Sequence, residues 1–421
     1  MDNNIIFWIW LQCCLGADNS HIHNIFDIFS DAIKIYLSDE KELTASGVFT
    51  SKELLKLKNK NLDTAKKIYN NSCMLGYDIF SLQDKNYPEL LKNIPTPPVV
   101  IYVKGKIPSK DRLFVAMVGT RHSSFTGKKT AFSLSYDLAK NGAVVVSGGA
   151  LGIDMQAHTG AIMAGGETVC VMGCGINYNY LTANKNLRDE ISKHGALISE
   201  YPPDYPPAKY TFPKRNRIIS GMSDCTVVIE AGKTSGALIT AQDAVKQHRT
   251  VFAVPGSVEN ASSLGSNLLI KEGAKTLLDF NDILEWYKAS GKNNVNKITV
   301  ENIEKIRRLG NKKVKSKKEK VVSVVHNNYK DKSSKNNLSD DNADIYNKKE
   351  VNGKENENKI LHEMLTENAS AVYDTISDTP IHVDEIKTLT NLKINEVLSA
   401  LTELEMNGLV TLHSGRRYIR K

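Results

Sequence analysis

The chain has 421 residues, 41% of them hydrophobic and 24% charged, with a formal net charge of +8. This length exceeds one ordinary domain and suggests two or three, and the hydrophobic content is sufficient for packed cores. No apolar stretch approaches the roughly 18 residues of a membrane span, so we expect no membrane association. Residues 289–358 hold 17 Lys and Arg against 10 Asp and Glu, which accounts for most of the excess charge. Bulk charge therefore does not by itself indicate that the remainder of the chain binds nucleic acid.

The six cysteines lie mostly inside apolar runs, with neither a CxxC pair nor a nearby His cluster. This spacing argues against a zinc site and favours reduced core thiols in a cytoplasmic protein, so we expect no metal. The apolar start, residues 1–16, has no basic n-region and is interrupted by Gln12. We interpret it as a buried helix, not as a signal peptide.

Residues 1–85 alternate apolar and polar positions at helical spacing, with Ser, Asp and Thr at N-cap positions and no Val-rich runs. This pattern predicts a small helical domain, similar to SAM or helix-hairpin-helix domains.

Residues 86–288 show a different pattern, in which short β-rich apolar runs alternate with helical ones. We expect strands at 113–118, 143–146, 168–172, 196–199, 226–229 and 250–254, with helices beginning at Gly127, Asp154, Asn184, Ser235 and Gly265. Short continuous strands separated by helices predict an α/β domain whose parallel sheet is covered on both faces.

Residues 289–358 are rich in Lys, Asn and Ser, which is typical of a flexible basic linker. Its one expected helix is a weakly amphipathic piece at 300–309. Periodicity returns in residues 359–421, with helices expected at 360–365, 383–389 and 394–406, followed by two short strands around a Ser-Gly turn. Three helices and a hairpin of this length predict a winged-helix domain.

Three glycine-bearing turns follow strands of the expected sheet. The first contains Gly119, Thr120 and Arg121, where backbone amides, a helix N-terminus and a guanidinium favour an anion. The alternative is an ordinary strand-to-helix turn with a surface arginine, and both readings stay open. Ligands of open parallel sheets bind at the carboxyl ends of the strands, where this turn would lie.

The second turn contains Gly148 and Gly149, and Asp154 is placed to cap the helix that follows. It lacks the GxGxxG spacing and a ribose-reading acid about 20 residues on, so an NAD site is disfavoured and we expect no cofactor. His158 has no visible partner and is interpreted as structural, not as a catalytic base.

The third turn lies between Glu230, which ends a strand, and a helix that opens with Thr234, Ser235 and Gly236. No GxSxG elbow or adjacent base would activate Ser235, so we interpret it as an N-cap and expect no catalytic residue.

The segment KYTFPKRNR, residues 209–217, contains no acid and precedes an apolar run; we treat it as a cationic loop. Single-stranded nucleic acid is bound by a basic groove together with aromatic faces that stack on bases. Its cations are Lys209, Lys214, Arg215 and Arg217, and its rings are Tyr210 and Phe212. The alternative is a loop whose charges are only solvated and bind no nucleic acid, and this motif alone does not decide between the two functions.

Taken together, these motifs resemble the DprA/Smf family (DNA-processing protein A). GTR, SGGALGID followed by AH, FPKRNRIISG, SGALITA and AVPG occur in the family's order and spacing, from Tyr87–Pro88 to about residue 274. The resemblance implies an extended Rossmann-like fold that binds single-stranded DNA and forms a homodimer. It also implies a cytoplasmic protein, not an enzyme, that loads the RecA recombinase onto incoming strands in natural transformation or general DNA processing.

By the same resemblance, Arg121 and Lys209 would contact DNA phosphates and Phe212 would stack on a base. The remaining residues of the implied DNA-binding set are Gly119, Thr120, Gly148, Gly149, Lys214, Arg215, Asn216 and Arg217. Arg215 and Arg217 would either extend the basic groove or hold their segment through buried hydrogen bonds, and we favour the second role for Arg217.

The chain departs from the family pattern in three respects, one of which is a basic linker longer than the resemblance leads us to expect. Leu181 and Thr182 stand where the family usually has a proline and a basic residue, which would weaken one DNA contact. The family's Gly-x-Gly turn appears as GADNSH, so phosphate binding by the helical domain is not expected.

Two rival functions remain. The cytokinin-activating phosphoribohydrolases resemble this fold, but their PGGxGTxxE motif has no counterpart in EAGKTSGALITA, whose following helix has no glutamate, so hydrolysis is disfavoured. The other rival is a duplex-binding regulator that acts through the winged helix. The C-terminal Arg416, Arg417, Arg420 and Lys421 are basic enough for DNA, but winged helices equally serve protein contacts, and this choice stays open.

Overall fold

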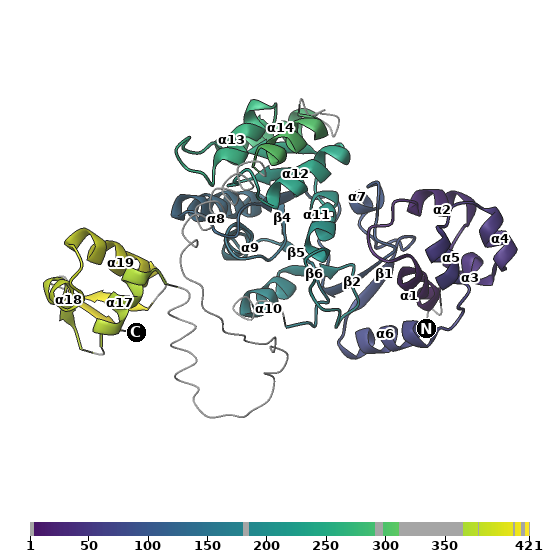
Figure 1. The fold of residues 1–421 in the computed structure, drawn as a ribbon, viewed down its shortest axis with the longest axis horizontal. Coiled ribbons are helices and arrows are strands. Elements are labelled where there is room, and N and C mark those ends of the chain that lie inside the picture. The colour runs from purple at the N-terminus through teal and green to yellow at the C-terminus, as the bar shows by residue number, and fades with distance from the viewer. Residues whose placement is uncertain are drawn as a thin grey trace, which may run out of the picture. The chain divides into compact units, whose positions relative to one another are not determined.

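The computed structural model describes residues 4–179, 185–290, 298–310, 365–377, 379–406, 409–413 and 417–420. The chain forms two compact units, Met1–Asp331 and Lys332–Lys421, which are drawn in Figure 1 and are described separately below. The departure at Leu181 and Thr182 and most of the expected linker lie outside the described residues.

The first unit begins with short helices, as expected from the periodicity. They are α1 (Asn4–Leu15), α2 (Ile22–Ile28), α3 (Ala32–Leu37), α4 (Glu40–Ala45), α5 (Ser51–Leu57) and α6 (Asp63–Met74). Asp31, Asp39 and Thr50 cap α3, α4 and α5 by accepting hydrogen bonds from backbone amides three residues on. The apolar start is confirmed as a buried helix, since Ile9 and Leu11 in α1 are fully buried.

A nine-stranded sheet follows, in the order β1-β2-β6-β5-β4-β3-β7-β8-β9. All neighbours from β6 to β9 run parallel, whereas β2 is antiparallel to both β6 and β1. The strands are β1 (Asp78–Ser81), β2 (Val100–Gly105), β3 (Phe114–Val118), β4 (Val144–Ser147), β5 (Thr168–Met172), β6 (Gly195–Ser199), β7 (Cys225–Val228), β8 (Thr250–Ala253) and β9 (Lys275–Thr276). The six expected strands and the parallel α/β fold are confirmed, but β1, β2 and β9 are additions to them.

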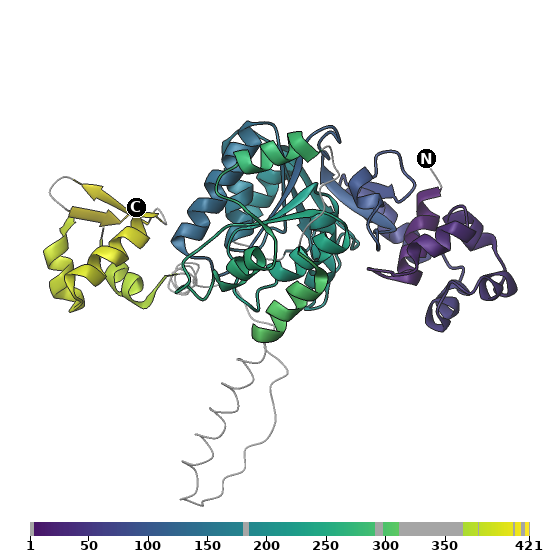
Figure 2. The ribbon, with the colours of Figure 1, turned by 90° about the horizontal axis from the view of Figure 1, so that it is seen from above.

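The connecting helices cover both faces of this sheet (Figure 2). They are α7 (Glu89–Lys92), α8 (Phe125–Lys140), α9 (Ile153–Met163), α10 (Lys185–Lys193), α11 (Thr211–Gly221), α12 (Ala237–Lys246), α13 (Leu264–Lys271) and α14 (Asn281–Ser290). Because side chains alternate along a strand, Val115 and Met117 of β3 pack with α8, α9 and α14. Ala116 and Val118 face the opposite core, to which α11, α12 and α13 contribute.

Most of the segment that we expected to be a cationic loop is helical: residues 211–217 begin α11, and Lys209 and Tyr210 precede it. Pro213 is compatible with this helix because it lies in the first turn, where a missing backbone N–H removes no intrahelical bond. Ile218 and Ile219 anchor the second half in the core. The loop interpretation is therefore wrong for Lys214, Arg215 and Arg217, which belong to a rigid helix, whereas Lys209 precedes that helix.

The expected helix near residues 300–309 is present at 300–310 and packs against the first unit. Ile303 and Ile306 are buried in the larger core of that unit. Gln242 of α12 bridges two helical residues, since its amide donates to Glu304 and accepts from Arg307, each at 3.0 Å. This portion of the expected linker is held by packing.

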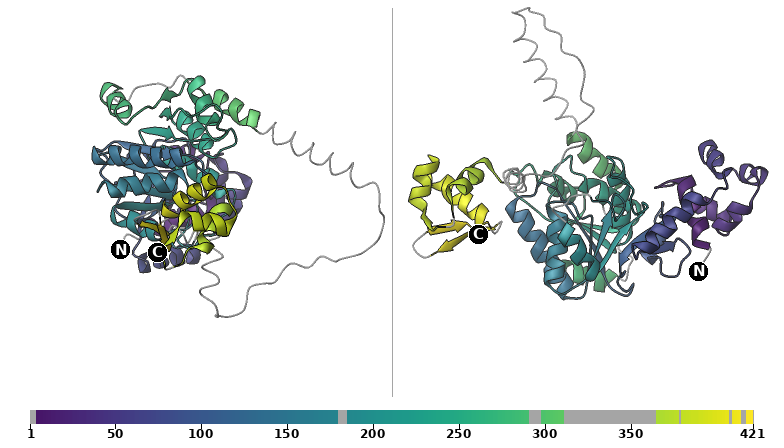
Figure 3. Two further views of the ribbon diagram at one scale, coloured as in Figure 1. Left: turned by 90° about the vertical axis from the view of Figure 1, so that its left-hand side faces the viewer. Right: turned by 90° about the horizontal axis from the view of Figure 1, so that it is seen from below.

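The described residues of the second unit have the winged-helix arrangement, with three helices and a three-stranded sheet of order β10-β12-β11. In both panels of Figure 3 it is drawn at the yellow end of the chain. Its elements are α17 (Glu367–Thr375), β10 (Ile381–His382), α18 (Val383–Thr390), α19 (Ile394–Met406), β11 (Val410–His413) and β12 (Arg417–Arg420). The helix expected at 360–365 lies almost entirely outside the described residues, and the first described helix is α17. Within the described residues of both units, no helix is long and apolar enough to cross a membrane.

Candidate nucleic-acid interface

The three glycine-bearing turns meet at one edge of the sheet. They follow β3, β4 and β7, which are adjacent in the order β4-β3-β7. The chain moves from β3 to β4 on one side and later returns to β7 on the other, so the switch point of the topology lies at β3. Ligands of open α/β sheets bind in the crevice at such a point.

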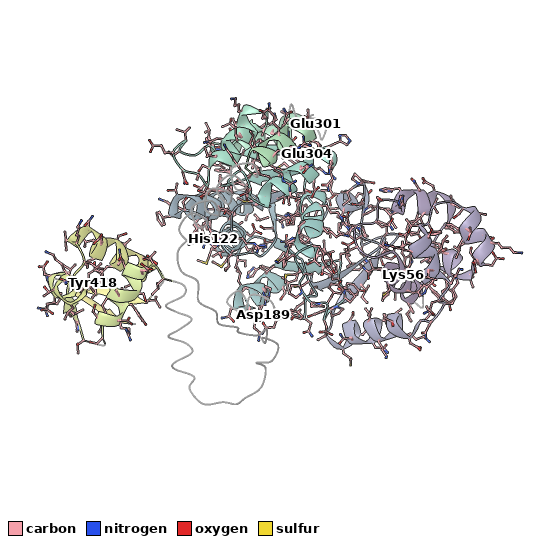
Figure 4. The ribbon with its side chains drawn as sticks, viewed as in Figure 1. Lys56, His122, Asp189, Glu301, Glu304 and Tyr418 are labelled. Carbon is pink, nitrogen blue, oxygen red and sulfur yellow. The ribbon has the colours of Figure 1, made fainter. Side chains whose placement is uncertain are left out.

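A pocket of about 690 Å³ opens at this switch point. The turn after β3 supplies Gly119, Thr120, Arg121 and His122, and His122 is labelled in Figure 4. The segment before α11 and the helix itself supply Lys209, Phe212, Arg215 and Asn216, and the start of α12 supplies Ser235, Gly236 and Thr240. Seven of the eleven sequence-predicted residues therefore line one pocket, and Gly148, Gly149, Lys214 and Arg217 do not.

Cationic and aromatic groups are paired at the pocket wall. The guanidinium carbon of Arg121 lies 5.4 Å from the centroid of the Phe212 ring, within the range of a cation–π interaction. The ring also packs on Gly173, where a Cβ atom would come 2.7 Å from the Phe212 Cδ1 atom. Arg121 and Lys209 are both exposed. The wall thus offers two solvent-accessible cations beside an aromatic ring that is held in place by its contact with Gly173.

Arg215 is buried and supports the second glycine turn from beneath. Its Nη1 atom donates to the carbonyl oxygen of Gly148 at 2.6 Å and also to that of Val171. A Cβ atom on Gly148 would lie 2.6 Å from the guanidinium, so this close approach requires glycine. Asp154 does not cap its own helix as expected, since its Oδ2 accepts from the Gly148 amide at 3.2 Å. Burial raises the pKa of Asp154, although the nearby Arg215 opposes the rise.

Gly152 fixes the turn that carries Arg121. Its φ of +83° lies in the left-handed region, and an added Cβ would meet the carbonyl oxygens of Thr120 and Arg121 at 2.5 and 2.6 Å. The tight contact between the β3–α8 and β4–α9 turns therefore depends on a residue without a side chain. Sequence reasoning noted this glycine in the motif but did not identify its contact.

Lys214 and Arg217 point toward the N-terminal helices. The Lys214 ammonium donates to the carbonyl oxygen of Ala17 at 3.0 Å. Arg217 is 5% exposed, and its guanidinium donates to Glu200 Oε1 at 2.6 Å and to Asp18 Oδ1 at 3.1 Å. Asp18 belongs to the GADNSH turn, so this turn is linked to α11 by an ion pair with Arg217.

The remaining polar candidates are committed to structural contacts. The Thr168 hydroxyl donates to the Val145 carbonyl oxygen, so it accepts from Nδ1 of the fully buried His158 at 2.7 Å. Burial lowers the pKa of His158 to about 3, which keeps the imidazole neutral. Ser235 accepts from the Ala237 amide at 3.3 Å, a capping role one residue before the formal N-cap, Gly236.

Glu230 also holds a turn in place. It is 3% exposed and accepts from the backbone amide and the hydroxyl of Ser124, the residue that caps α8. The N-terminus of α8 is thereby positioned beside the Arg121 turn.

Sequence reasoning placed Ser235 and Gly236 at this edge of the sheet but did not name them as DNA contacts, and it missed Thr240. Ser235, Gly236 and Thr240 line the pocket because α11 and α12 pack together. The spacing of Phe212, Asn216 and Ile219 is the i, i+4, i+7 signal that could have identified α11 as a helix with one face on the pocket.

Comparison with known proteins gives the same family for both units. A family model described as DNA recombination-mediator protein A matches residues 78–288, and a DprA winged helix domain model matches residues 362–416. A DNA processing protein DprA of Bacillus subtilis is 41% identical over 212 residues, covering 50% of this chain and 71% of the relative. A protein Smf of Synechocystis is 31% identical over 342 residues, covering 80% of this chain and 79% of the relative.

A solved structure supports the fold assignment. The X-ray structure of DprA from Streptococcus pneumoniae matches with a TM-score of 0.59 and 33% identity, covering 66% of this chain and 97% of that one. The expected Rossmann-like fold with a helical start and a winged helix is confirmed. With half of its length matched by the family model and relatives matched over most of their own length, the chain belongs to the DprA/Smf family of DNA recombination-mediator proteins.

Proposed function

We propose that the pocket at the β3 switch point binds the backbone of single-stranded DNA, and that the protein delivers this strand to the RecA recombinase. The observation that carries the proposal is the position of the Arg121 guanidinium over the Phe212 ring, in a pocket that Lys209 also lines. Single strands are held by cations that follow the phosphates and by rings that stack on bases, and this wall offers both within one pocket.

On binding, the guanidinium of Arg121 would leave the Phe212 ring and pair with a DNA phosphate. In the free protein the guanidinium lies over the Phe212 ring. A phosphate that enters the pocket attracts the guanidinium, which can bind two phosphate oxygens at once. Its departure uncovers the ring face, on which an unpaired base can then stack. Lys209, exposed and without a described partner, supplies a second phosphate contact at the same rim.

The predicted DNA-binding residues divide into contacts and supports. We propose Arg121, Lys209 and Phe212 as contacts, with Gly119, Thr120 and Asn216 completing the pocket surface. Arg215 and Arg217 are buried, and we propose that they hold the glycine turn and α11 in place. Lys214 supports the contact with the N-terminal helices. A bound polynucleotide would therefore contact fewer cations than the sequence motif contains.

We further propose that the protein is not an enzyme. Two groups that line the pocket could act as bases, Asp154 and His122. Asp154 accepts a hydrogen bond from the Gly148 amide, and His122 is exposed, with no carboxylate bonded to its ring among the described residues. Incubation of the pure protein with nucleoside monophosphates tests the hydrolase alternative, because the release of free base would show a catalytic function.

Cytoplasmic location, a homodimer and RecA as partner stay predictions. A second protomer would extend the path of the strand and raise the apparent affinity, because linked sites bind cooperatively along one polymer. Sedimentation of the free protein over a range of concentrations tests the dimer directly.

The decisive experiment for the function is a titration by fluorescence anisotropy with single- and double-stranded oligonucleotides at two salt concentrations. We expect tighter binding of the single strand, with an affinity that falls steeply as salt rises because bound phosphates release counterions. The assembly of RecA on the same strand, measured with and without the protein, tests delivery. Equal affinity for both DNA forms would contradict the proposed pocket function, whereas normal strand binding without faster RecA assembly would contradict delivery alone.

A further inference from the structure

The rim of the pocket beside Lys209 carries two tyrosines that have no role in the proposed contacts. Tyr210, which precedes α11, is 56% exposed, and its hydroxyl oxygen lies 2.9 Å from that of Tyr205. Pro207, Ala208 and Lys209, which lie between the two tyrosines in the chain, line the pocket. The tyrosine pair is therefore continuous with the pocket wall.

The Tyr205 ring is held in place by buried neighbours. It stacks on the ring of Tyr201, with 4.8 Å between the centroids and 24° between the planes, and Tyr201 is only 5% exposed. The Tyr205 carbonyl oxygen accepts a hydrogen bond from the Gly175 amide at 2.8 Å, and a Cβ atom on Gly175 would collide with the carbonyl oxygen of Pro203. The turn after β6 thus fits closely against the turn after β5, and this contact fixes the backbone at Tyr205.

Tyr210 is held by the closed turn that precedes α11. The Thr211 hydroxyl donates to the Ala208 carbonyl oxygen at 2.8 Å and accepts from the Ala208 amide at 3.2 Å, and Thr211 is fully buried. Tyr210 lies within this turn, with its side chain exposed. Both rings are therefore in position before a ligand arrives, so a ligand that stacks on them would lose little free energy to the ordering of side chains.

The charges beside the tyrosine pair differ in sign. The exposed Lys209 is adjacent in the chain to one tyrosine, and the exposed Asp204 is adjacent to the other. The Asp204 carboxylate accepts hydrogen bonds from the side-chain amides of Asn177 and Asn71, at 2.6 and 2.5 Å. A phosphate would be attracted by Lys209 and repelled by Asp204, whereas the face of a base carries no net charge. The pair is therefore suited to stacking on a base, and not to binding a further anion.

We propose that Tyr205 and Tyr210 form a second stacking shelf for single-stranded DNA, on which a base next to the one at Phe212 lies. This inference rests on the proposed function of the pocket and extends the site along the strand. Lys209 would hold the phosphate between the two bases. Because the pair follows β6 and Arg121 follows β3, the strand would run along the carboxyl edge of the sheet from β3 toward β6. Every base has a face that can stack, so the shelf would lengthen the site without adding sequence preference.

The first test measures binding of a single-stranded oligothymidylate to the full chain by fluorescence anisotropy. A length of about twelve nucleotides lies within the usual range of single-strand sites. Tyr210→Leu should weaken binding by about fivefold or more, the low end of the loss for one base–aromatic stack. The salt dependence of binding should stay unchanged, because no phosphate contact is removed. Tyr210→Phe keeps the ring and should bind within about twofold of the wild type.

Tyr136→Leu is the matched control. Tyr136 also has a cation beside its ring, with the Lys140 Nζ atom 5.8 Å from the centroid. Both residues lie near the C-terminal end of α8, away from the carboxyl edge of the sheet. This variant should bind single-stranded DNA as the wild type does. Wild-type affinity in Tyr210→Leu, or an equal loss in Tyr136→Leu or Tyr210→Phe, would overturn the inference.

Photocrosslinking of the wild-type chain provides a second test that needs no variant. The oligonucleotide carries 5-iodouracil at one position, which is moved along the strand, and mass spectrometry identifies the crosslinked residue. We expect crosslinks to Phe212 from one position and to Tyr205 or Tyr210 from a neighbouring position. A set of crosslinks that never includes Tyr205 or Tyr210 would overturn the shelf.

These outcomes separate the shelf from the pocket on which it rests. If the wild-type chain binds the single strand no better than the duplex, the proposed pocket function fails and the shelf fails with it. If strand binding depends on Arg121 and Lys209 but is unchanged in Tyr210→Leu, the shelf alone is refuted and the pocket function stands.

Discussion

The guanidinium of Arg121 lies over the ring of Phe212, with 5.4 Å from Cζ to the ring centroid, although the two residues are 91 positions apart in the chain. Arg121 is carried by the turn after β3 and Phe212 by the first turn of α11. Ile218 and Ile219 of α11 pack in the core beneath the sheet. The positions of the two groups are therefore set before single-stranded DNA binds. Charge and stacking surface are thereby available together.

Replacing Phe212 by leucine should separate the contribution of stacking from that of charge. Leucine fills part of the space but has no π-face, so single-strand affinity should fall by about 1–3 kcal/mol, the usual value for one base–aromatic stack. The dependence of affinity on salt should stay as in the wild type, because no phosphate contact is lost. Phe212→Tyr is the control and should retain binding. A reduced salt dependence in Phe212→Leu would show that the ring acts only by positioning a cation.

Replacing Gly152 by alanine should damage both stability and strand binding. The position has φ of +83°, and the new Cβ would collide with the carbonyl oxygens of Thr120 and Arg121. Gly165 is a matched control, because its φ is +69° but an added Cβ has nothing within 4 Å. Gly165→Ala should therefore show only the backbone cost, on the order of 1 kcal/mol in the free energy of unfolding measured with urea. Equal strand affinity in the two variants would mean that the contact between the turns does not position Arg121.

Replacing Arg217 by methionine should destabilise the first unit strongly. It would leave Glu200, which is 3% exposed, as a buried carboxylate without its ion pair. Breaking one partner of a buried pair typically costs about 3–5 kcal/mol in the free energy of unfolding. The exposed pair between Lys193 and Glu190 provides the comparison, since Lys193→Met should change the unfolding midpoint little. Strand affinity measured on still-folded Arg217→Met should be close to the wild-type value if Arg217 is a support and not a contact.

Asp243 should make the stability of the first unit depend on pH. Burial raises its pKa to about 6, with Asp18 adding to the rise and Lys246 opposing it. An unfolded aspartate titrates near pH 4, so between about pH 4 and 6 the folded chain binds a proton that the unfolded chain lacks. The stability that this proton contributes is complete below pH 4 and is lost as the pH rises through 6.

The variant Asp243→Asn removes this ionisation. It should raise the free energy of unfolding at pH 7.5 by roughly 1–3 kcal/mol, since each pKa unit corresponds to about 1.4 kcal/mol. The gain should disappear at pH 4. Urea unfolding at both pH values measures it, with the exposed Asp27→Asn as control. A stabilisation that is the same at both pH values would contradict a raised pKa of the carboxyl group.

The sequence predicts the parts of the fold that depend on local pattern. The six β-rich runs became strands, and the three turns after β3, β4 and β7 came together because carboxyl ends of parallel strands share an edge. Helix α11 was missed for a physical reason. Its core-facing positions include Arg215 and Arg217, where pattern reasoning expects apolar side chains, and both are tolerated only because distant groups neutralise or bond them.

The roles within the basic motif depend on the same distant partners. Lys214 and Arg217 look equivalent to Lys209 in the sequence, but their acceptors, Ala17 and Asp18, lie about 200 residues earlier. The antiparallel pair of β1 and β2 was likewise missed. The four residues of β1 have too little apolar pattern to indicate a strand, which is defined by its pairing with β2. Tertiary contacts, and not local propensity, decide these elements.

The salt dependence of single-strand binding by the double variant Arg121→Ala/Lys209→Ala tests the central claim most directly. For single strands, the slope of log affinity against log salt changes by about 0.7 for each phosphate contact. Removing the two proposed contacts should lower affinity and make the slope shallower by about 1.4, while Lys214→Ala leaves the slope unchanged. A double variant that binds with the wild-type affinity and slope would contradict the assignment of this pocket to the DNA backbone.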